Sequence, residues 1–317
     1  MAAIAGSAPP PRIFTLLPAT SDGAEASSEP LSAFPDAEFP DVCLAAEYAP
    51  LLAAAGTAQD GIGATIAFAD TVDSTQKMPA AAWGVAGAPH GSVAVARHQT
   101  EGRGRSSNTW TSPEGCLMFT TALRAPAAWG AHVALLQHAM AIAVVEGVQA
   151  AIAATGAKPA QLHIKWPNDI YATPPAASEG SGAPVKVGGI LVQSEFDSAA
   201  SAFLLKVGCG LNVYDTPPYA ALNDWVDPPL HKAALLGHIM LALQDVWQAF
   251  EAGEAAGDPF QALLPRYHAL WLHSDMRVTA GDAPVATPAE GTAGRLAGQR
   301  GPGGQRPRRR ARVEPAP

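Results

Sequence analysis

The sequence predicts an α+β domain built on a mixed, largely antiparallel sheet that is flanked by helices. Three observations predict it: three short β-type runs come first, one long helical segment follows them, and further β-type runs precede two final helices. The strict alternation of strand and helix that builds a parallel sheet is missing. We therefore expect the strands to pair mainly in antiparallel fashion.

The first three strands are expected in the runs ATIAFAD, GSVAVAR and CLMFTTALR, which are β-leaning and end at polar loops. Between the second and third runs lies the stretch ARHQTEGRGRSSNTWTSPEG, residues 96–115. From Ala131 to Thr155, apolar residues recur at every third or fourth position. This spacing predicts a long buried helix.

Further strands and two helices are expected in the second half of the chain. QLHIKW and NDIYA predict two strands around Pro167, and VKVGGILVQSEF and AFLLKVGCGLNV predict a strand pair joined by DSAAS. Residues 173–184, TPPAASEGSGAP, form a low-complexity insert at a hairpin tip. Helices are expected near residues 230–252 and 258–271, the second opened by Asp258 and Pro259.

Composition divides the chain into three regions. Residues 1–60 contain proline clusters and no sustained period, which predicts a mostly disordered leader. Residues 61–273 carry the expected strands and helices. Residues 274–317 are rich in arginine, glycine and proline and lack an apolar period. We therefore expect one folded domain between two regions of different character.

Charge and cysteine content bound the class of protein. The formal net charge of the 317 residues is -8, and seven arginines lie near the C-terminus, so the body of the chain is acidic and DNA binding is not expected. Cys43, Cys116 and Cys209 are odd in number and lack metal-ligand spacing, which favours a reducing compartment. We expect a cytoplasmic protein.

Targeting signals are weak in this sequence. Residues 1–40 lack the apolar core of a signal peptide and are too acidic for a persuasive transit peptide, so mitochondrial or plastid location is the alternative. His132, Gln137, His138 and Glu146 interrupt the longest apolar run. A membrane span is therefore not expected.

The loop at residues 96–115 is a candidate anion site. Arg103 and Arg105 are fixed cations whose planar heads match phosphate and carboxylate oxygens, and Gly102 and Gly104 let a ligand approach the backbone closely. Gly-Arg strings also occur in disordered segments that bind nucleic acid. On its own, the string leaves both interpretations open.

KWPND, residues 165–169, places Lys165 and Asp169 around a kink at a strand end. The alternative is a structural turn, with Asp169 bonded to backbone donors and Trp166 in the core. DTVDSTQ, residues 70–76, offers hydroxyl and amide groups for a ligand or for capping a helix. Both roles are compatible in that stretch.

Two glycine motifs lie on the strand pair. KVGGILV places Lys186 at the mouth of a strand, where Gly188 and Gly189 leave room for a ligand. GCGLNV repeats the arrangement with two more glycines and an asparagine. The glycines could instead relieve crowding under the long helix, so both interpretations stay open.

Taken together and in this order, the motifs DST, QTEGRGRSSNTWTSPEGC, QHAMAIAVVEGV, KWPNDIY, KVGGILV and GCGLNV resemble the biotin–protein ligase family, and most closely its eukaryotic members, the holocarboxylase synthetases. The resemblance runs from about Thr65 to His273. It implies a catalytic fold related to the class II aminoacyl-tRNA synthetases over residues 61–273. It also implies that residues 274–317 are a truncated or aberrant form of the family's small C-terminal subdomain.

The resemblance implies an ATP-dependent enzyme that forms biotinyl-5′-adenylate and transfers biotin to a lysine of a biotin carboxyl carrier domain of carboxylases. Magnesium is expected with the ATP, and its protein ligands and the oligomeric state are left unassigned. One alternative is a lipoate–protein ligase, which shares the fold and the adenylation chemistry. Another is a non-catalytic biotin-binding regulator, although residues 1–60 contain no helix-turn-helix motif of the kind that binds operator DNA.

The resemblance also implies roles for individual residues. Lys186, Arg105 and Asp169 are expected to serve the chemistry. The residues expected to contact biotin are Ser74, Thr75, Gln76, Gln99, Gly102, Arg103, Gly104, Arg105, Lys186, Gly189, Gly208 and Gly210. Arg105, Trp110, Lys186 and Asn212 are expected to contact ATP, with Trp110 covering the adenine. Position 76 is glutamine where bacterial members commonly have asparagine.

Overall fold

The structure is a computed structural model that describes residues 11–16, 29–58, 60–83, 87–106, 108–158, 160–174, 182–214, 216–274, 279–280 and 283–284. The chain divides into two compact units, Met1–Leu272 and His273–Pro317. In the second unit, the described residues form two short antiparallel strands, β10 (Thr279–Ala280) and β11 (Ala283–Pro284). The expected low-complexity insert and the arginine-rich tail lie largely outside the described residues.

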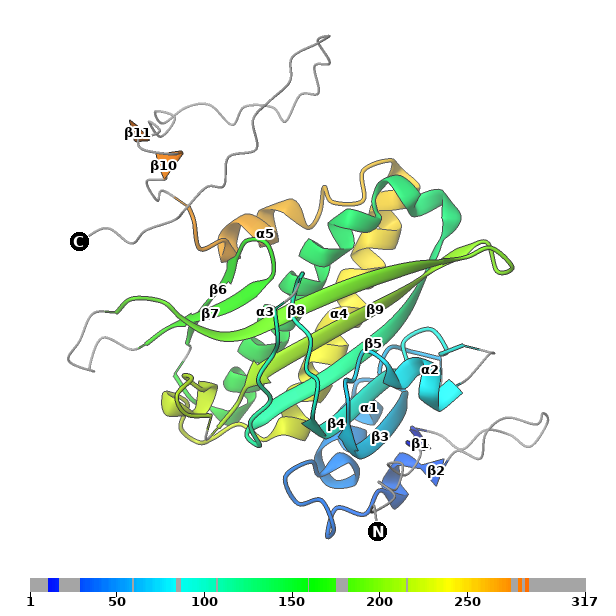
Figure 1. The fold of residues 1–317 in the computed structure, drawn as a ribbon, viewed down its shortest axis with the longest axis vertical. Coiled ribbons are helices and arrows are strands. Elements are labelled where there is room, and N and C mark those ends of the chain that lie inside the picture. Colours follow the sequence, from blue (N-terminus) through cyan, green and yellow to red (C-terminus); the bar gives the residue numbers. More distant parts are fainter. Residues whose placement is uncertain are drawn as a thin grey trace, which may run out of the picture. The chain divides into compact units, whose positions relative to one another are not determined.

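In the described part of the first unit, nine strands form one sheet in the order β2-β1-β3-β4-β5-β9-β8-β7-β6 (Figure 1). The strands are β1 (Arg12–Thr15), β2 (Glu29–Pro30), β3 (Thr65–Val72), β4 (Val93–Gln99), β5 (Cys116–Pro126), β6 (Gln161–Lys165), β7 (Asp169–Thr173), β8 (Val185–Asp197) and β9 (Ala202–Asn212). β1 pairs with β2 and β3 with β4 in parallel, whereas the other neighbours are antiparallel. The expected mixed, largely antiparallel sheet is confirmed.

Helices cover the sheet unevenly. α1 (Ala49–Ala54), α3 (Leu136–Thr155), α4 (Lys232–Ala256) and α5 (Leu264–Leu270) contribute to the main apolar core with one sheet face. α2 (Met78–Trp83) packs in a separate cluster against alanines of β3 and β4 on the other face. In β9, Val207 and Leu211 are buried in the main core, so the alternating Gly208 and Gly210 lie on the opposite face. That face is where a ligand can reach the sheet.

The two long helices pack closely because small residues lie between them. A Cβ atom at Gly147 of α3 would lie 2.5 Å from the Cα atom of Ile239 in α4. Each helix ends at a glycine in the left-handed region, Gly156 after α3 (φ 76°) and Gly257 after α4 (φ 90°), as is common at helix C-termini. The segment Val133–Thr155 is long and apolar enough to cross a membrane by composition, and 67% of it is buried inside the fold. Packing against α4, β6 and β8 accounts for its apolar character.

The prediction that residues 1–60 are a mostly disordered leader is wrong for residues 11–16, which carry β1 of the sheet, and for residues 29–58, which pack into the domain. Short 3₁₀ and π-helical turns, Leu31–Ala33 and Leu44–Tyr48, lead into α1. The ring of Phe34 lies 5.2 Å from that of Phe14 in β1 and 4.9 Å from that of Phe68 in β3. These widely spaced apolar residues show no period in the sequence, and only the folded sheet brings them together.

One helix boundary also differs from its prediction. The last helix was expected to begin at Asp258 and Pro259, but α5 begins at Leu264. The Asp258 carboxylate accepts a hydrogen bond from the Phe260 N–H at 3.1 Å. Asp258 therefore caps a turn, and the helix starts beside the next proline, Pro265.

Candidate active site

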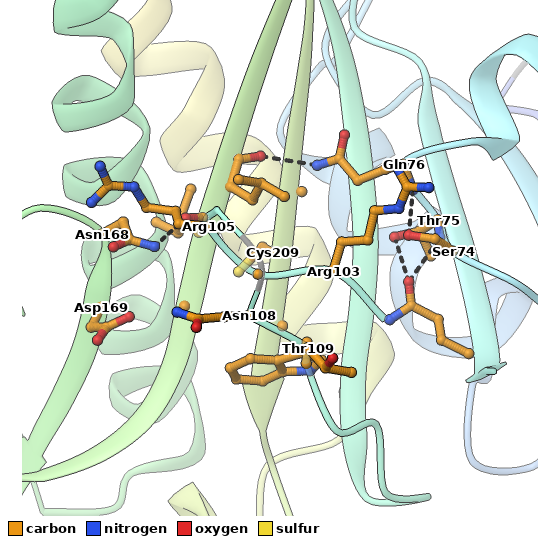
Figure 2. Close-up of a pocket in the computed structure, with 18 of the residues that line it drawn as sticks. Ser74, Thr75, Gln76, Arg103, Arg105, Asn108, Thr109, Asn168, Asp169 and Cys209 are labelled. Atoms are coloured by element: carbon orange, nitrogen blue, oxygen red, sulfur yellow. Dashed lines mark hydrogen bonds between the residues drawn. The ribbon is translucent and has the colours of Figure 1, made fainter. Parts of the chain in front are cut away.

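A cavity lies over β8 and β9 on the face that α3 and α4 leave uncovered. Its volume is about 350 Å³, and it is bounded by the turn after β3, the loop between β4 and β5, and the start of β7. The lining residues are Ser74, Thr75, Gln76, Gln99, Arg103, Gly104, Arg105, Ser106, Asn108, Thr109, Trp110, Asn168, Asp169, Lys186, Gly189, Ile190, Leu191, Gly208, Cys209 and Gly210 (Figure 2). The motifs that the sequence singled out therefore meet in one place.

Residues 100–115, here called the arginine loop, fold back on themselves over the cavity. The Gly104 N–H donates to the Asn108 carbonyl at 2.8 Å, and the Trp110 N–H donates to the Gly102 carbonyl at 2.9 Å. The side chains of Arg103 and Arg105 point to opposite sides of the pocket (Figure 2). Within the described residues, no carboxylate lies within salt-bridge distance of either guanidinium. Both cations are thus available to an anionic ligand.

Lys186 and Asp169 form an ion pair at the mouth of the cavity. The Lys186 Nζ atom lies 2.8 Å from Asp169 Oδ1 and 5.6 Å from the centre of the Trp110 ring. Pairing between β7 and β8 produces this proximity, because Asp169 is opposite Gly189 and Tyr171 is opposite Lys186. The two side chains are 42% and 28% exposed, so solvent and a ligand can reach them.

A polar network fixes the turn after β3. Gln99 Oε1, at the end of β4, accepts hydrogen bonds from the Thr75 N–H at 2.8 Å and from the Thr75 hydroxyl at 3.1 Å. The Gln99 amide nitrogen donates to Ser112 Oγ at 3.0 Å. Thr120 Oγ1 in β5 donates to Thr75 Oγ1 at 3.0 Å. Residues 74–76 are therefore held in place before any ligand arrives.

Gln76 provides a buried amide on the same side. Its Nε2 donates to the Leu191 carbonyl at 2.9 Å (Figure 2), and its Oε1 is buried with no hydrogen-bond donor in the described part of the chain. A Cβ atom at Gly208 would lie 2.1 Å from Gln76 Nε2. Gly208 thus makes room for this amide, and the free Oε1 is an acceptor for a ligand N–H.

Trp110 covers the second glycine of β9. A Cβ atom at Gly210 would lie 2.6 Å from Trp110 Cε2, whereas one at Gly189 would lie 3.5 Å from Cζ3, an ordinary contact. We expected a ligand to occupy the space above Gly210, but in the structure the indole ring of Trp110 occupies it. The alternative of crowding under the long helix is wrong for Gly208 and Gly210, because they face away from α3.

Cys209 lines the cavity but is not a nucleophile. Burial raises the pKa of its thiol, and burial likewise raises the pKa of Cys116 to about 12. Both thiols therefore stay protonated at neutral pH.

Three residues singled out in the sequence lie elsewhere. Gly102 and Asn212 are absent from the cavity wall, and the Asn212 amide donates to the Ala220 carbonyl at 3.1 Å. A Cβ atom at Gly102 would lie 2.3 Å from the Trp110 carbonyl oxygen, so this glycine closes the loop. Trp166, expected in the core, is 59% exposed on the turn between β6 and β7.

Sequence reasoning missed several lining residues: Ser106, Asn108, Thr109, Asn168, Ile190, Leu191 and Cys209. Asn168 could have been predicted as a lining residue, since it lies inside the KWPND motif. Its Nδ2 donates to the Ile190 carbonyl at 2.9 Å, and its own carbonyl accepts from the Ile190 N–H at 2.8 Å. Asn168 thereby locks the start of β7 against β8.

No cluster of three or more histidine, cysteine or carboxylate side chains suitable for a metal ion occurs among the described residues. The cavity is lined by cations, amides and hydroxyls, and Asp169 is its one carboxylate among the described residues. A protein-held metal centre does not fit these residues.

Comparison with known proteins identifies relatives of the domain. A family profile described as biotin/lipoate A/B protein ligase matches residues 68–212. A protein from Arabidopsis thaliana named biotin–protein ligase 2 is 36% identical over 199 residues, which cover 61% of this chain and 54% of that protein. A human biotin–protein ligase is 29% identical over 234 residues, covering 70% of this chain and 30% of the human one. The chain thus spans about half the length of the plant relative and less of the human one.

A solved structure supports the fold. The biotin protein ligase from Aquifex aeolicus, determined in complex with biotin and ATP, superposes with a TM-score of 0.51 and 24% identity. The match covers 69% of this chain and 84% of that one. The sheet and its covering helices are therefore those of the biotin ligase catalytic fold.

Proposed function

We propose, from the premise that the chain belongs to the biotin–protein ligase family, that it is an ATP-dependent biotin–protein ligase. The observation that carries the proposal is the cavity that Arg103, Arg105 and Lys186 all line, the arginines from a loop and the lysine from a strand. Joining a carboxylate to a nucleotide phosphate brings two anions together. Such a reaction needs fixed cations at the meeting point.

The proposed reaction has two steps. A biotin carboxylate oxygen forms a bond to the α-phosphorus of ATP while the bond to the β-phosphate breaks, which yields biotinyl-5′-adenylate and pyrophosphate. The amine of a carrier lysine then bonds to the acyl carbon, AMP leaves, and the amine loses a proton. Both steps require the reactants to be held in line and shielded from water.

Arg105 and Lys186 are proposed to neutralise the carboxylate and the α-phosphate. Arg105 has no carboxylate partner among the described residues, and Lys186 is held by Asp169 at 2.8 Å. Asp169 keeps the flexible lysine directed at the cavity mouth and is the candidate acceptor for the proton of the carrier amine. Arg103, on the other side of the loop, is proposed to hold the biotin end.

The polar end of the cavity fits the ring system of biotin. Its ureido group offers two N–H donors and one carbonyl, and Gln76 Oε1 is a buried acceptor without a donor in the described chain. Ser74 and Thr75 add hydroxyls, and the Thr75 hydroxyl is held in place by Gln99. Gly189, Gly208 and Gly210 keep the neighbouring sheet surface free of side chains.

Trp110 is proposed to stack on the adenine. Its ring already lies on Gly210 with one face, next to Lys186, so a base can add to the outer face. Magnesium is proposed as a companion of the triphosphate, bound through phosphate oxygens and water, because the described residues contain no carboxylate cluster for it. Asn212, hydrogen-bonded to Ala220, is left without a nucleotide role here.

Biotin is favoured over lipoate because the relatives from plant and human both carry the name biotin–protein ligase. A purely regulatory biotin-binding protein would not require Lys186 and Arg105 at the cavity. The test is incubation of the purified chain with ATP, magnesium, a carrier domain and either biotin or lipoate. Biotinyl transfer supports the proposal, and lipoyl transfer without biotinyl transfer overturns it.

A further inference from the structure

We propose that Asp41, on the segment that precedes the predicted domain, is a positioning residue that holds the arginine loop in its binding conformation. Asp41 lies outside the cavity wall. Its carboxylate connects two cations, Arg97 on the strand that leads into the loop and Lys232 beside the end of the loop. The substrate readouts below rest on the proposed function, whereas the loop conformation does not.

Arg97 is the first of the two cations. It precedes the arginine loop by three residues, and its Nη2 atom lies 3.9 Å from Oε1 of Glu114 near the end of the loop. It lies on β4, two residues before Gln99. Its Nε atom is 2.9 Å from Asp41 Oδ1, and its Nη1 donates to Asp70 Oδ1 of β3 at 2.8 Å. Arg97 is therefore held by two carboxylates through different N–H groups, one of them from the N-terminal segment.

Lys232 is the cation at the end of the loop. Its side chain is only 4% exposed at the start of α4, and its Nζ donates to Asp41 Oδ2 at 3.0 Å and to the Glu114 carbonyl at 3.0 Å. The same Nζ lies 5.2 Å from the centre of the Tyr214 ring. Glu114 is the second-last residue of the loop, so Asp41 orients the lysine that fixes this end.

The carboxylate is charged where it lies. Burial opposes the ionisation of Asp41, but hydrogen bonds from Lys232 and Arg97 outweigh it and hold the pKa of Asp41 below its usual value. A buried ammonium whose counter-charge is removed must find another partner or move toward water. Without Asp41, Lys232 would leave the Glu114 carbonyl.

Between its ends, the loop contacts the sheet through Ser112, which accepts a hydrogen bond from Gln99, and through Trp110, which lies on Gly210. The bonds between Gly102 and Trp110 and between Gly104 and Asn108 join parts of the loop to each other. They keep the hairpin shape but do not orient it over β8 and β9. Backbone bonds from Glu101 to Asp73 and from Val213 and Tyr214 to Gly115 fix the termini, and Asp41 links these two termini through its cations. Loss of the link lets the hairpin tilt away from the cavity.

The test compares Asp41→Asn with Glu146→Gln. The control removes a carboxylate that binds Arg266 between α3 and α5, a partly buried ion pair away from the loop. Amide hydrogen exchange of residues 100–115 is measured in the free protein, and KM and kcat for biotin and ATP are measured in adenylation. For Asp41→Asn we expect the exchange rate of the loop amides to rise about tenfold. We also expect KM to rise about tenfold while kcat stays within about twofold of the wild type, because the ligand must then bring the loop back into its binding conformation.

For Glu146→Gln we expect a lower thermal midpoint with unchanged KM and unchanged loop exchange. If Asp41→Asn behaves like this control, Asp41 is merely structural and the proposal is overturned. If Asp41→Asn does not fold, Arg97→Lys replaces it, since one amine cannot reach Asp41 and Asp70 in the way two N–H groups do. A smaller rise in both loop exchange and KM is expected, and no rise in either overturns the proposal. The wild-type protein could also bind neither biotin nor ATP while Asp41→Asn still shows faster exchange of the loop amides. That result would support the role of Asp41 in holding the loop and would refute the proposed function.

Discussion

The Nζ atom of Lys186 lies 2.8 Å from Oδ1 of Asp169, although the two residues belong to different motifs on different strands. Both side chains are partly exposed, and a pair of this kind contributes at most about 1 kcal/mol to folding. The pair therefore matters for the direction of the lysine rather than for stability. A substitution at Lys186 can therefore test its role in the reaction without a large loss of stability.

We predict that Lys186→Ala lowers the rate of biotin-dependent pyrophosphate release by about 100-fold or more, because one fixed charge at the transition state is lost. The thermal midpoint should hardly change. Lys206→Ala is the matched control, since Lys206 of β9 pairs with Glu195 of β8 but does not line the cavity. Pyrophosphate release at near wild-type rate in Lys186→Ala would contradict the role.

The two arginines should give different kinetic defects, because they point to opposite sides of the pocket. We predict that Arg103→Ala raises KM for biotin about tenfold and releases the adenylate faster, whereas Arg105→Ala mainly lowers kcat. Rapid-quench measurement of adenylate retained on the enzyme distinguishes them. Equal changes in KM and kcat for the two variants would show that Arg103 and Arg105 do not have separate roles.

Two paired glycines should tolerate alanine differently. Gly210→Ala places a Cβ 2.6 Å from Trp110, whereas Gly189→Ala makes an ordinary 3.5 Å contact with the same ring. We predict that Gly210→Ala lowers the free energy of unfolding by about 1–3 kcal/mol and raises KM for ATP, since Trp110 must move. Gly189→Ala should change stability by less. Denaturant unfolding of both variants checks the difference, and equal stabilities would argue against the placement of the ring.

Stability should fall in mild acid because of buried histidines. His90 Nδ1 accepts the Arg124 N–H at 3.0 Å, and burial holds the pKa of His90 below its usual 6.5. As the pH falls, His90 is therefore protonated in the unfolded chain before it is protonated in the folded protein. The free energy of unfolding decreases over the pH range from about 6.5 down to the lower pKa of folded His90. We predict that His90→Asn, which keeps an acceptor but cannot titrate, flattens the dependence of the thermal midpoint on pH between about 7.5 and 5. A slope equal to that of the wild type would contradict this.

The strand patterns were sufficient to predict seven of the nine strands in the described sheet, β3 to β9, and the resemblance to a known family supplied most of the cavity residues. Gly208 and Gly210 had to share a face because side chains alternate along a strand, and the hairpin of β8 and β9 brings Gly189 opposite Gly210. The ion pair of Lys186 with Asp169 needed the register of β7 on β8. No local pattern contains that register.

The predictions that were wrong concern residues whose surroundings are set by the folded chain rather than by their neighbours in the sequence. Phe34 and Phe39 stand among prolines, and their partners Phe14 and Phe68 lie in separate strands, so the packing of the N-terminal segment is entirely long-range. Trp166 was assigned to the core by residue type, but the turn that carries it projects into solvent.

The link between Asp41 and Lys232 joins residues that are 191 positions apart. During synthesis on the ribosome, the arginine loop and all nine described strands of the sheet emerge before Lys232 does. Long-range contacts of this kind form late in folding. We therefore expect that a nascent chain can pair its strands before the arginine loop is held over the cavity, and that the loop is fixed only when the first turn of α4 has been added.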